Sequence, residues 1–481
     1  DQVSFYGQDS FRINRRLTLN YGVRYDADIG FYNPKNGSQA TNRAVLALQK
    51  IGQLPQGDRA LPQDDRNNFS PRIGIAFDPT GTGKAVLRAS YGLFYDQIFQ
   101  NVQFFGLQQA GNSIYALQVF DPIRIGIDPT PVRTGFLPDL PAGVGSGRFI
   151  DPNIRTPYTQ QASINFQYEF KPGYIFDTNY IHILGLHQFV NVELNPRAGV
   201  LDPNYVVGQT TPRILNAAFA AAGIGPFSRF RMASSINRSR YDGFTVGINK
   251  RYSGSSNFKY QFGFNYTLAR ALVYGSAQGA QVNDFGFTFE NPFNFFRPVD
   301  FGRSNEDARH RAVFNGLVDI PYGFQISTII QAESARPFPV AADQDLNGDG
   351  LTFTDFPRLD AQGNFIKFNR GDKVTGTPTG INPGRGVPYF QVDLRVTKKF
   401  KLGEKATLQG YVEFFNLFNR SNVGNSFANS IFSTIPTGPN SSREAVNVKD
   451  IPSTGLLGSS FGAGTTIGIP FQAQFGVRLS F

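Results

Sequence analysis

The chain has 481 residues with 46 Lys and Arg against 36 Asp and Glu, a net charge of +10, and no cysteine. Its mean hydropathy of −0.26 excludes a bundle of membrane-spanning helices, which need apolar runs of about 18 residues or more. The basic residues are scattered rather than grouped, so they indicate solvated faces and not a nucleic-acid partner. The lack of cysteine excludes a disulfide framework and thiolate metal sites.

The N-terminal part of the chain reads as paired β-strands. Residues 3–13 and 17–26 predict a hairpin across a three-residue turn, because Leu, Leu, Tyr, Val and Tyr alternate with Thr, Asn, Gly and Arg along the second segment. A loop of about forty residues, rich in Gly, Pro and Asn, comes next. Residues 70–78 and 85–96 then predict a second hairpin across another short turn.

Further hairpins are expected along the rest of the chain. They pair residues 159–170 with 174–182, 241–252 with 258–267, 309–320 with 324–333, and 389–400 with 406–415. The clearest segment alternates Phe, Tyr, Phe, Phe and Tyr with Lys, Gln, Gly, Asn and Thr. Such alternation predicts a strand with one apolar face and one polar face.

The last eleven residues show the same alternation and end on an aromatic side chain. Between Phe471 and Phe481 every odd position is apolar and every even position is polar or Gly. About ten residues of this kind span a membrane in a β-barrel, with the apolar face toward lipid and the polar face toward the lumen. The segment therefore predicts a closing transmembrane strand.

Short turns alternate strictly with long loops along the whole chain. This asymmetry is typical of outer-membrane barrels, which have tight periplasmic turns and long extracellular loops. A β-sandwich or a propeller would mix loop lengths at both ends. The sequence therefore predicts an all-β fold, an antiparallel transmembrane β-barrel of the bacterial outer membrane, with about thirteen strands in this chain.

Several segments resemble one family of such barrels. They are Tyr6–Asp9, Leu17–Asp26, Arg309–Arg311, Tyr389–Phe400, Val412–Asn419 and Gln474–Phe481. In their order and spacing they are similar to TonB-dependent receptors of Gram-negative bacteria, and most similar to the Oar-like group that carries a carboxypeptidase-regulatory-like domain. The resemblance implies active uptake of a scarce solute, glycan or peptide into the periplasm, powered through the TonB complex. It also implies that the barrel assembly machinery recognises the strand ending in Phe481.

The sequence departs from that family at its start. The TonB box, the plug and the early barrel strands have no counterpart in residues 1–481. The family barrel has about 22 strands, and bacterial single-chain barrels close with an even number. We therefore expect residues 1–481 to be the C-terminal portion of the barrel, forming an open, strongly curved sheet or a strained closure.

Signals for enzymatic activity are poor. His182, His187 and His310 lack partners at ligand spacing. We expect a protein that is not an enzyme and needs no cofactor. The alternatives to a TonB-dependent receptor are a passive porin and a structural or adhesive surface protein, and a plug with a TonB box would decide between them.

Two sets of side chains are candidates for contact with a solute. Phenylalanines crowd into one expected extracellular loop, where they form either an apolar capture platform or a small loop core: Phe285, Phe287, Phe289, Phe293, Phe295 and Phe296. Arginines fall on the expected lumen face, where they either guide an anionic solute or pair with carboxylates of the wall or plug: Arg24, Arg72, Arg88, Arg395 and Arg478.

One expected extracellular loop carries a pattern typical of calcium loops. Oxygen-bearing side chains alternate before a glycine in Asp343-Gln-Asp345-Leu-Asn347-Gly-Asp349-Gly, which matches the first half of an EF-hand loop. Thr354 stands where that loop has Glu, and Asp355 could replace it only if the loop bulges. The pattern predicts a weak structural Ca²⁺ site with Asp343, Asp345, Asn347, Asp349 and Asp355 as candidate ligands, while an Asp-rich solvated turn is the alternative.

Overall fold

The structure is a computed structural model. It describes residues 1–32, 39–98, 102, 146–225, 227, 229–255, 258–275, 289–340, 342–352, 354–403, 406–420, 422 and 470–481. Within this part of the chain, no helix is both long and apolar enough to cross a membrane.

Among the described residues, thirteen strands pair one after another in a single antiparallel path. They are β1 (Gln2–Asn14), β2 (Leu17–Asp28), β3 (Asn68–Phe77), β4 (Ala85–Tyr95), β6 (Tyr158–Lys171), β7 (Tyr174–Glu193), β8 (Phe230–Ser255), β9 (Phe258–Tyr274), β11 (His310–Ile320), β12 (Phe324–Glu333), β17 (Tyr389–Leu402), β18 (Ala406–Phe415) and β19 (Gln472–Ser480). The predicted strand number and the antiparallel order are confirmed.

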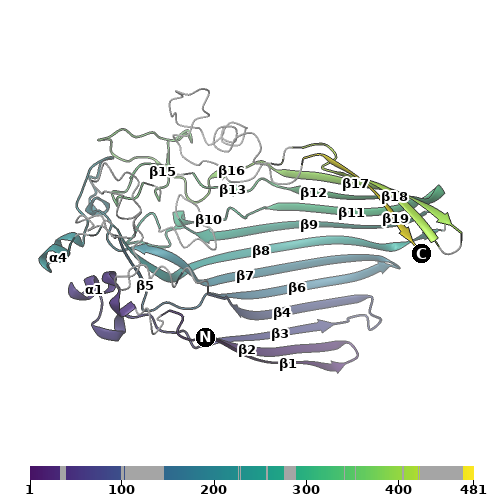
Figure 1. The fold of residues 1–481 in the computed structure, drawn as a ribbon, viewed down its shortest axis with the longest axis horizontal. Coiled ribbons are helices and arrows are strands. Elements are labelled where there is room, and N and C mark those ends of the chain that lie inside the picture. Colours follow the sequence, from purple (N-terminus) through teal and green to yellow (C-terminus); the bar gives the residue numbers. More distant parts are fainter. Residues whose placement is uncertain are drawn as a thin grey trace, which may run out of the picture.

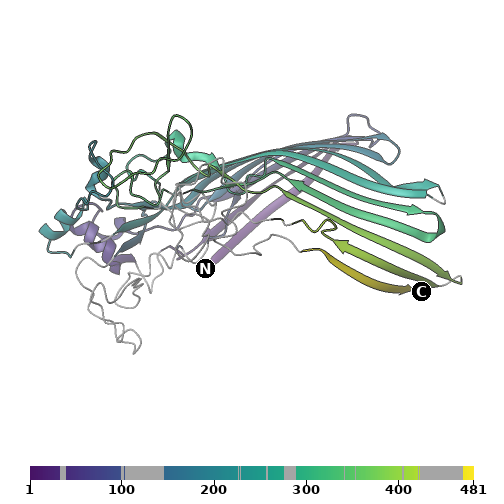
Figure 2. The ribbon, with the colours of Figure 1, turned by 90° about the horizontal axis from the view of Figure 1, so that it is seen from above.

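The sheet is curved and open, with β1 and β19 as its two edges (Figure 2). Every residue of β1 is exposed, as expected for an edge strand. Strands β7 and β8 extend well beyond the predicted segments 174–182 and 241–252. Their extensions pair with each other through register shifts between Gly185 and Val190, and they are covered by loops, which explains why simple alternation did not reveal them.

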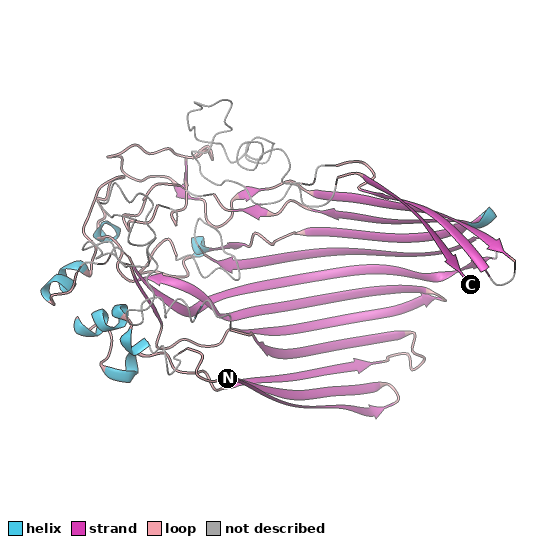
Figure 3. Ribbon diagram, in the orientation of Figure 1, coloured by secondary structure: helices cyan, strands magenta, loops and turns pink. Residues whose placement is uncertain are grey.

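The two ends of the sheet differ, as predicted (Figures 1 and 3). One end holds tight turns, whose geometry follows from a few residues. The Asn14 side-chain oxygen accepts from the backbone N–H groups of Arg16 and Leu17 at 2.8 and 3.0 Å, and Gly173 takes a positive φ of 79°. The Asp78 carboxylate accepts from the N–H groups of Gly81 and Gly83 at 2.9 and 2.7 Å, which makes residues 79–84 a capped turn.

The other end carries the described parts of the long connections, which fold together into a loop domain. Helices α1 (Arg43–Lys50) and α4 (Asn216–Ala221) lie there, with the short strands β5 (Gly147–Ile150), β10 (Phe301–Arg303), β13 (Pro337–Phe338), β14 (Arg358–Leu359), β15 (Thr377–Pro378) and β16 (Gly384–Arg385). Helix α1 begins where the Asn42 side chain accepts from the N–H of Ala44 at 2.8 Å, a regular N-cap.

The apolar packing of the loop domain is divided into several small cores. The first packs Val45 and Leu48 of α1 with Phe149, Phe219 and Phe230, all fully or nearly fully buried. Among the described residues, smaller groups centre on Ile150, Phe356 and Leu346. Each core is too small to order the whole loop domain, so polar contacts between the loops must contribute as well.

Candidate functional site

The two faces of the sheet have opposite chemical character. Phe264 lies beside Ile248 and Phe314 in register, while the next residue, Asn265, lies beside Gly247. Residues directly opposite one another share a face, so one face is an apolar belt and the other is polar. Phe264 is 41% exposed, which on the belt means contact with lipid.

Following the register from strand to strand places all five predicted lumen arginines on the polar face. Two of them pair with carboxylates of the wall: Arg24 with Asp26 at 2.8 Å and Arg395 with Glu413 at 3.1 Å. The remaining arginines have different surroundings. Arg72 stacks on the Phe94 ring at 4.4 Å, Arg88 donates to Asn165 at 3.1 Å, and Arg478 is exposed on β19.

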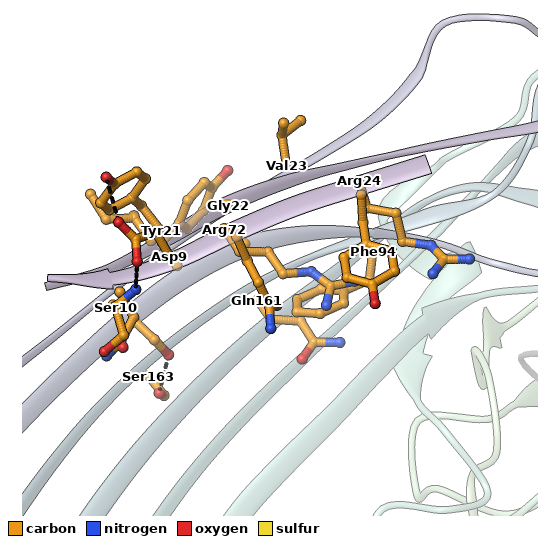
Figure 4. Close-up of a pocket in the computed structure, with 18 of the residues that line it drawn as sticks. Asp9, Ser10, Tyr21, Gly22, Val23, Arg24, Arg72, Phe94, Gln161 and Ser163 are labelled. Carbon is orange, nitrogen blue, oxygen red and sulfur yellow. Dashed lines mark hydrogen bonds between the residues drawn. The ribbon is translucent and has the colours of Figure 1, made fainter. Parts of the chain in front are cut away.

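A hollow of about 880 Å³ lies against the polar face of β1, β2, β3, β4, β6 and β7 (Figure 4). Side chains that project into it include Arg24, Arg72, Phe94, Gln161 and Ser163. The lining mixes polar side chains with apolar carbon surface, and part of its polar groups are already paired with neighbours of the same wall. The hollow is open, so it resembles a lumen surface more than a closed pocket for one ligand.

The phenylalanine-rich loop is only partly described. Phe285 and Phe287 lie outside the described residues. Phe289 is fully buried, and its ring lies 5.3 and 5.4 Å from those of Phe295 and Phe296, which are themselves half-buried. Only Phe293 of the four described rings is strongly exposed. The described part of the loop is therefore a small core and not an open apolar platform.

A buried ion-pair network follows this core. The Glu290 carboxylate is paired with Arg297 at 2.7 Å and with Arg358 at 3.1 Å, and it accepts from the Phe356 N–H at 3.0 Å. Arg297 also pairs with the buried Asp300 at 2.7 Å. The network joins residues 289–300 to residues 356–358, so it ties two long loops to each other.

Next to the network lies a cluster of three aspartates. One carboxylate oxygen from each of Asp345, Asp349 and Asp355 lies within 4.8 Å of the other two. Asp349 and Asp355 are 0% exposed. One oxygen of Asp349 and both oxygens of Asp355 have no hydrogen-bond partner, and in the described residues no Lys or Arg lies within ion-pair distance of the three carboxylates.

The electrostatics of the cluster are unfavourable for three bare charges. Burial raises the pKa of Asp345, and burial together with the neighbouring aspartates raises the pKa of Asp349 and Asp355 well above the usual range. Such carboxylates require either protons or a cation to compensate them.

Four of the five predicted calcium ligands are close together, and one is not. Asn347 lies between Asp345 and Asp349 in the same turn, where its side-chain oxygen accepts from the Asp349 N–H at 2.9 Å. Asp343 is exposed and outside the cluster. The sequence pattern did not reveal Glu290 and Tyr205, which contact this turn from other loops, because neither residue belongs to a local motif.

The fold and its two faces define a class: a curved antiparallel sheet with an apolar belt, a polar inner face and a loop domain at one end is an outer-membrane β-barrel protein. The sequence agrees, because residues 1–446 match the family described as outer membrane beta barrel domain, and the chain belongs to that family. The predicted fold class and outer-membrane location are thereby confirmed.

Solved structures of similar fold include transporters and receptors. The outer membrane transporter YddB from Escherichia coli gives a TM-score of 0.51 at 11% identity, over 88% of this chain and 42% of that one. The FrpB iron transporter from Neisseria meningitidis gives 0.45 at 10% identity, over 100% of this chain and 45% of that one. The chain thus spans less than half the length of either structure. No curated protein sequence matches it.

Proposed function

We propose that this chain is the barrel portion of a TonB-dependent outer-membrane receptor that takes up a scarce solute into the periplasm. The observation that carries the proposal is the combination of a polar, hollowed inner face with a folded loop domain at one end only. The loops would capture the solute, and the inner face would house a plug and conduct the solute when TonB acts on that plug.

The lumen arginines fall into two groups. Arg24 and Arg395 are neutralised by carboxylates of the wall, so they hold the wall in one arrangement and fit a housing role. Among the described residues no ion pair is formed by Arg72, Arg88 or Arg478, so these three cations are available to a plug or to an anionic solute.

A passive porin is the second candidate, since a polar lumen by itself also fits an open channel. The two differ in permeability and in energy coupling. The intact outer-membrane protein, reconstituted into liposomes, should not admit arabinose in a swelling assay, and in cells it should form a cross-link with the periplasmic domain of TonB. Rapid swelling without a TonB cross-link would establish the porin. Neither swelling nor a cross-link would favour a structural or adhesive role.

A further inference from the structure

We propose that Asp345, Asp349 and Asp355 bind one Ca²⁺ ion inside the loop domain. The three carboxylate oxygens lie within 4.8 Å of one another. Calcium binds oxygen ligands at about 2.3–2.6 Å, so two ligands on opposite sides of one ion are about 4.6–5.2 Å apart. A single ion can therefore contact all three side chains without a large rearrangement of the loop.

Burial leaves these carboxylates in need of a compensating positive charge. The unpartnered oxygens of Asp349 and Asp355 point into a region from which solvent is excluded. The nearby guanidinium of Arg358 is already engaged by Glu290 at 3.1 Å. An uncompensated buried carboxylate is costly, and three together repel one another, so a divalent cation supplies the missing positive charge.

The loop is shaped as calcium loops are. Both oxygens of Asp345 accept backbone N–H groups, from Gly348 at 2.7 Å and from Gly350 at 2.8 Å. Gly348 and Gly350 take positive φ values of 81° and 86°. At Gly350 an added Cβ would lie 2.7 Å from the Arg197 side chain, so this position admits only glycine without a shift.

The ligand set also corrects the sequence alignment with the EF-hand loop by two residues. Asp345, Asn347 and Asp349 take the first, third and fifth positions, Gly350 takes the sixth, and Asp355 closes the site. In the alignment predicted from sequence, Asp343 came first, but it is exposed and outside the cluster.

Calcium fits this site better than magnesium. Magnesium demands near-octahedral geometry at about 2.0–2.1 Å and usually keeps several waters. Asp349 and Asp355 are fully buried, which leaves little room for such waters. Calcium accepts variable geometry and direct carboxylate contact, so an all-protein cage of aspartates suits it.

The ion would hold three loops together. The Asp349 carbonyl accepts from the Arg197 N–H at 2.7 Å, and the Asp345 carbonyl accepts from the Tyr205 hydroxyl at 3.2 Å. Asn347 donates its side-chain N–H to the Glu290 carbonyl. Ordering the calcium loop therefore orders its contacts with residues 194–229 and 289–309 as well.

Calcium titration of the intact, detergent-purified protein tests the proposal. Calorimetry should show one Ca²⁺ per chain, with a dissociation constant on the order of 10⁻⁴–10⁻³ M as in other extracellular modules. Asp349→Asn and Asp355→Asn each keep the side-chain shape and should weaken binding at least about tenfold. Asp343→Asn is the matched control in the same loop and should leave the affinity unchanged. Mg²⁺ should bind more weakly than Ca²⁺ to the wild type.

A second readout locates the ion even if a variant folds poorly. The chain has no Trp, so luminescence of bound Tb³⁺ must be sensitised by tyrosine. Tyr205 adjoins the loop, and Tyr205→Phe should reduce Tb³⁺ emission several-fold while Ca²⁺ still displaces the metal. Flat calcium titrations of the wild type, or binding unaffected by both Asp349→Asn and Asp355→Asn, would overturn the proposal. Equal loss in Asp343→Asn would overturn the assigned ligand set.

Discussion

The sharpest consequence of the two-faced sheet concerns neighbouring residues on β9. Phe264→Arg places a charge on the apolar belt, whereas Asn265→Arg places the same charge on the polar face, one residue away. Phe264 lies six residues above the start of β9 at Phe258. At about 3.3 Å per residue and a tilt of about 40°, it sits roughly 15 Å from the periplasmic end, near the middle of the belt.

An arginine at that depth on the lipid face costs about 2–4 kcal/mol. Since every 1.4 kcal/mol is a tenfold change in an equilibrium constant, the ratio of folded to unfolded protein should fall by a factor of about 30 to 700. Asn265→Arg should cost far less, because its neighbours on the polar face are Val313 and Gly247, and Gly247 leaves room on its side for a longer side chain.

The measurement is the unfolding of both variants in lipid vesicles at increasing urea concentration, with the folded form detected by its mobility in a gel. Outer-membrane yield serves as a check in cells. A large loss for Phe264→Arg with near wild-type behaviour for Asn265→Arg is expected. Equal losses for the two variants would refute the assignment of the faces.

Two further predictions use single contacts. A methyl group at Gly476 would lie 2.2 Å from the Tyr411 ring, so Gly476→Ala should destabilise the last strand pair by about 1–3 kcal/mol in the same urea assay. Gly410→Ala is the control, because nothing lies within 4 Å of the added methyl group. Equal effects of the two substitutions would contradict the packing around Gly476. Glu290→Gln leaves the half-buried Arg358 without its carboxylate partner and Arg297 with Asp300 alone, and it should cost about 1–3 kcal/mol locally, seen as faster proteolysis of the loop domain. The exposed Glu306→Gln serves as the control, and matching proteolysis rates for the two variants would contradict the network.

The transmembrane strands could be predicted from sequence because the alternation of apolar and polar residues is visible within each strand segment alone. In a strand of period two, the lipid-facing residues must be apolar regardless of which strand lies beside them. The short turns are equally local, as Asn14 and Gly173 show. The upper parts of β7 and β8 could not be predicted in this way, because loops cover them and burial on both faces removes the alternation.

The contacts inside the loop domain could not be predicted from local sequence patterns. The aspartate pattern pointed to the loop of the proposed calcium site, but it placed the exposed Asp343 and the buried Asp355 in one ligand set, and only the folded loops separate them by burial. Glu290 precedes Phe356 by 66 residues and carries no motif, so its role as the partner of two arginines was invisible in the sequence. The phenylalanines were recognised as a group, yet their packing against one another required the fold.

The loop domain needs ionic contacts because its apolar cores are small. Its apolar packing is split into several small cores, and small cores rarely order long loops without a covalent or ionic staple. The chain has no cysteine, so disulfides cannot supply one. The Glu290 network and the proposed calcium ion lie side by side and join the same loops, so both add ionic contacts in a region where the apolar cores are small. On this argument, removal of calcium should loosen residues 342–359 first and leave the strands of the sheet intact.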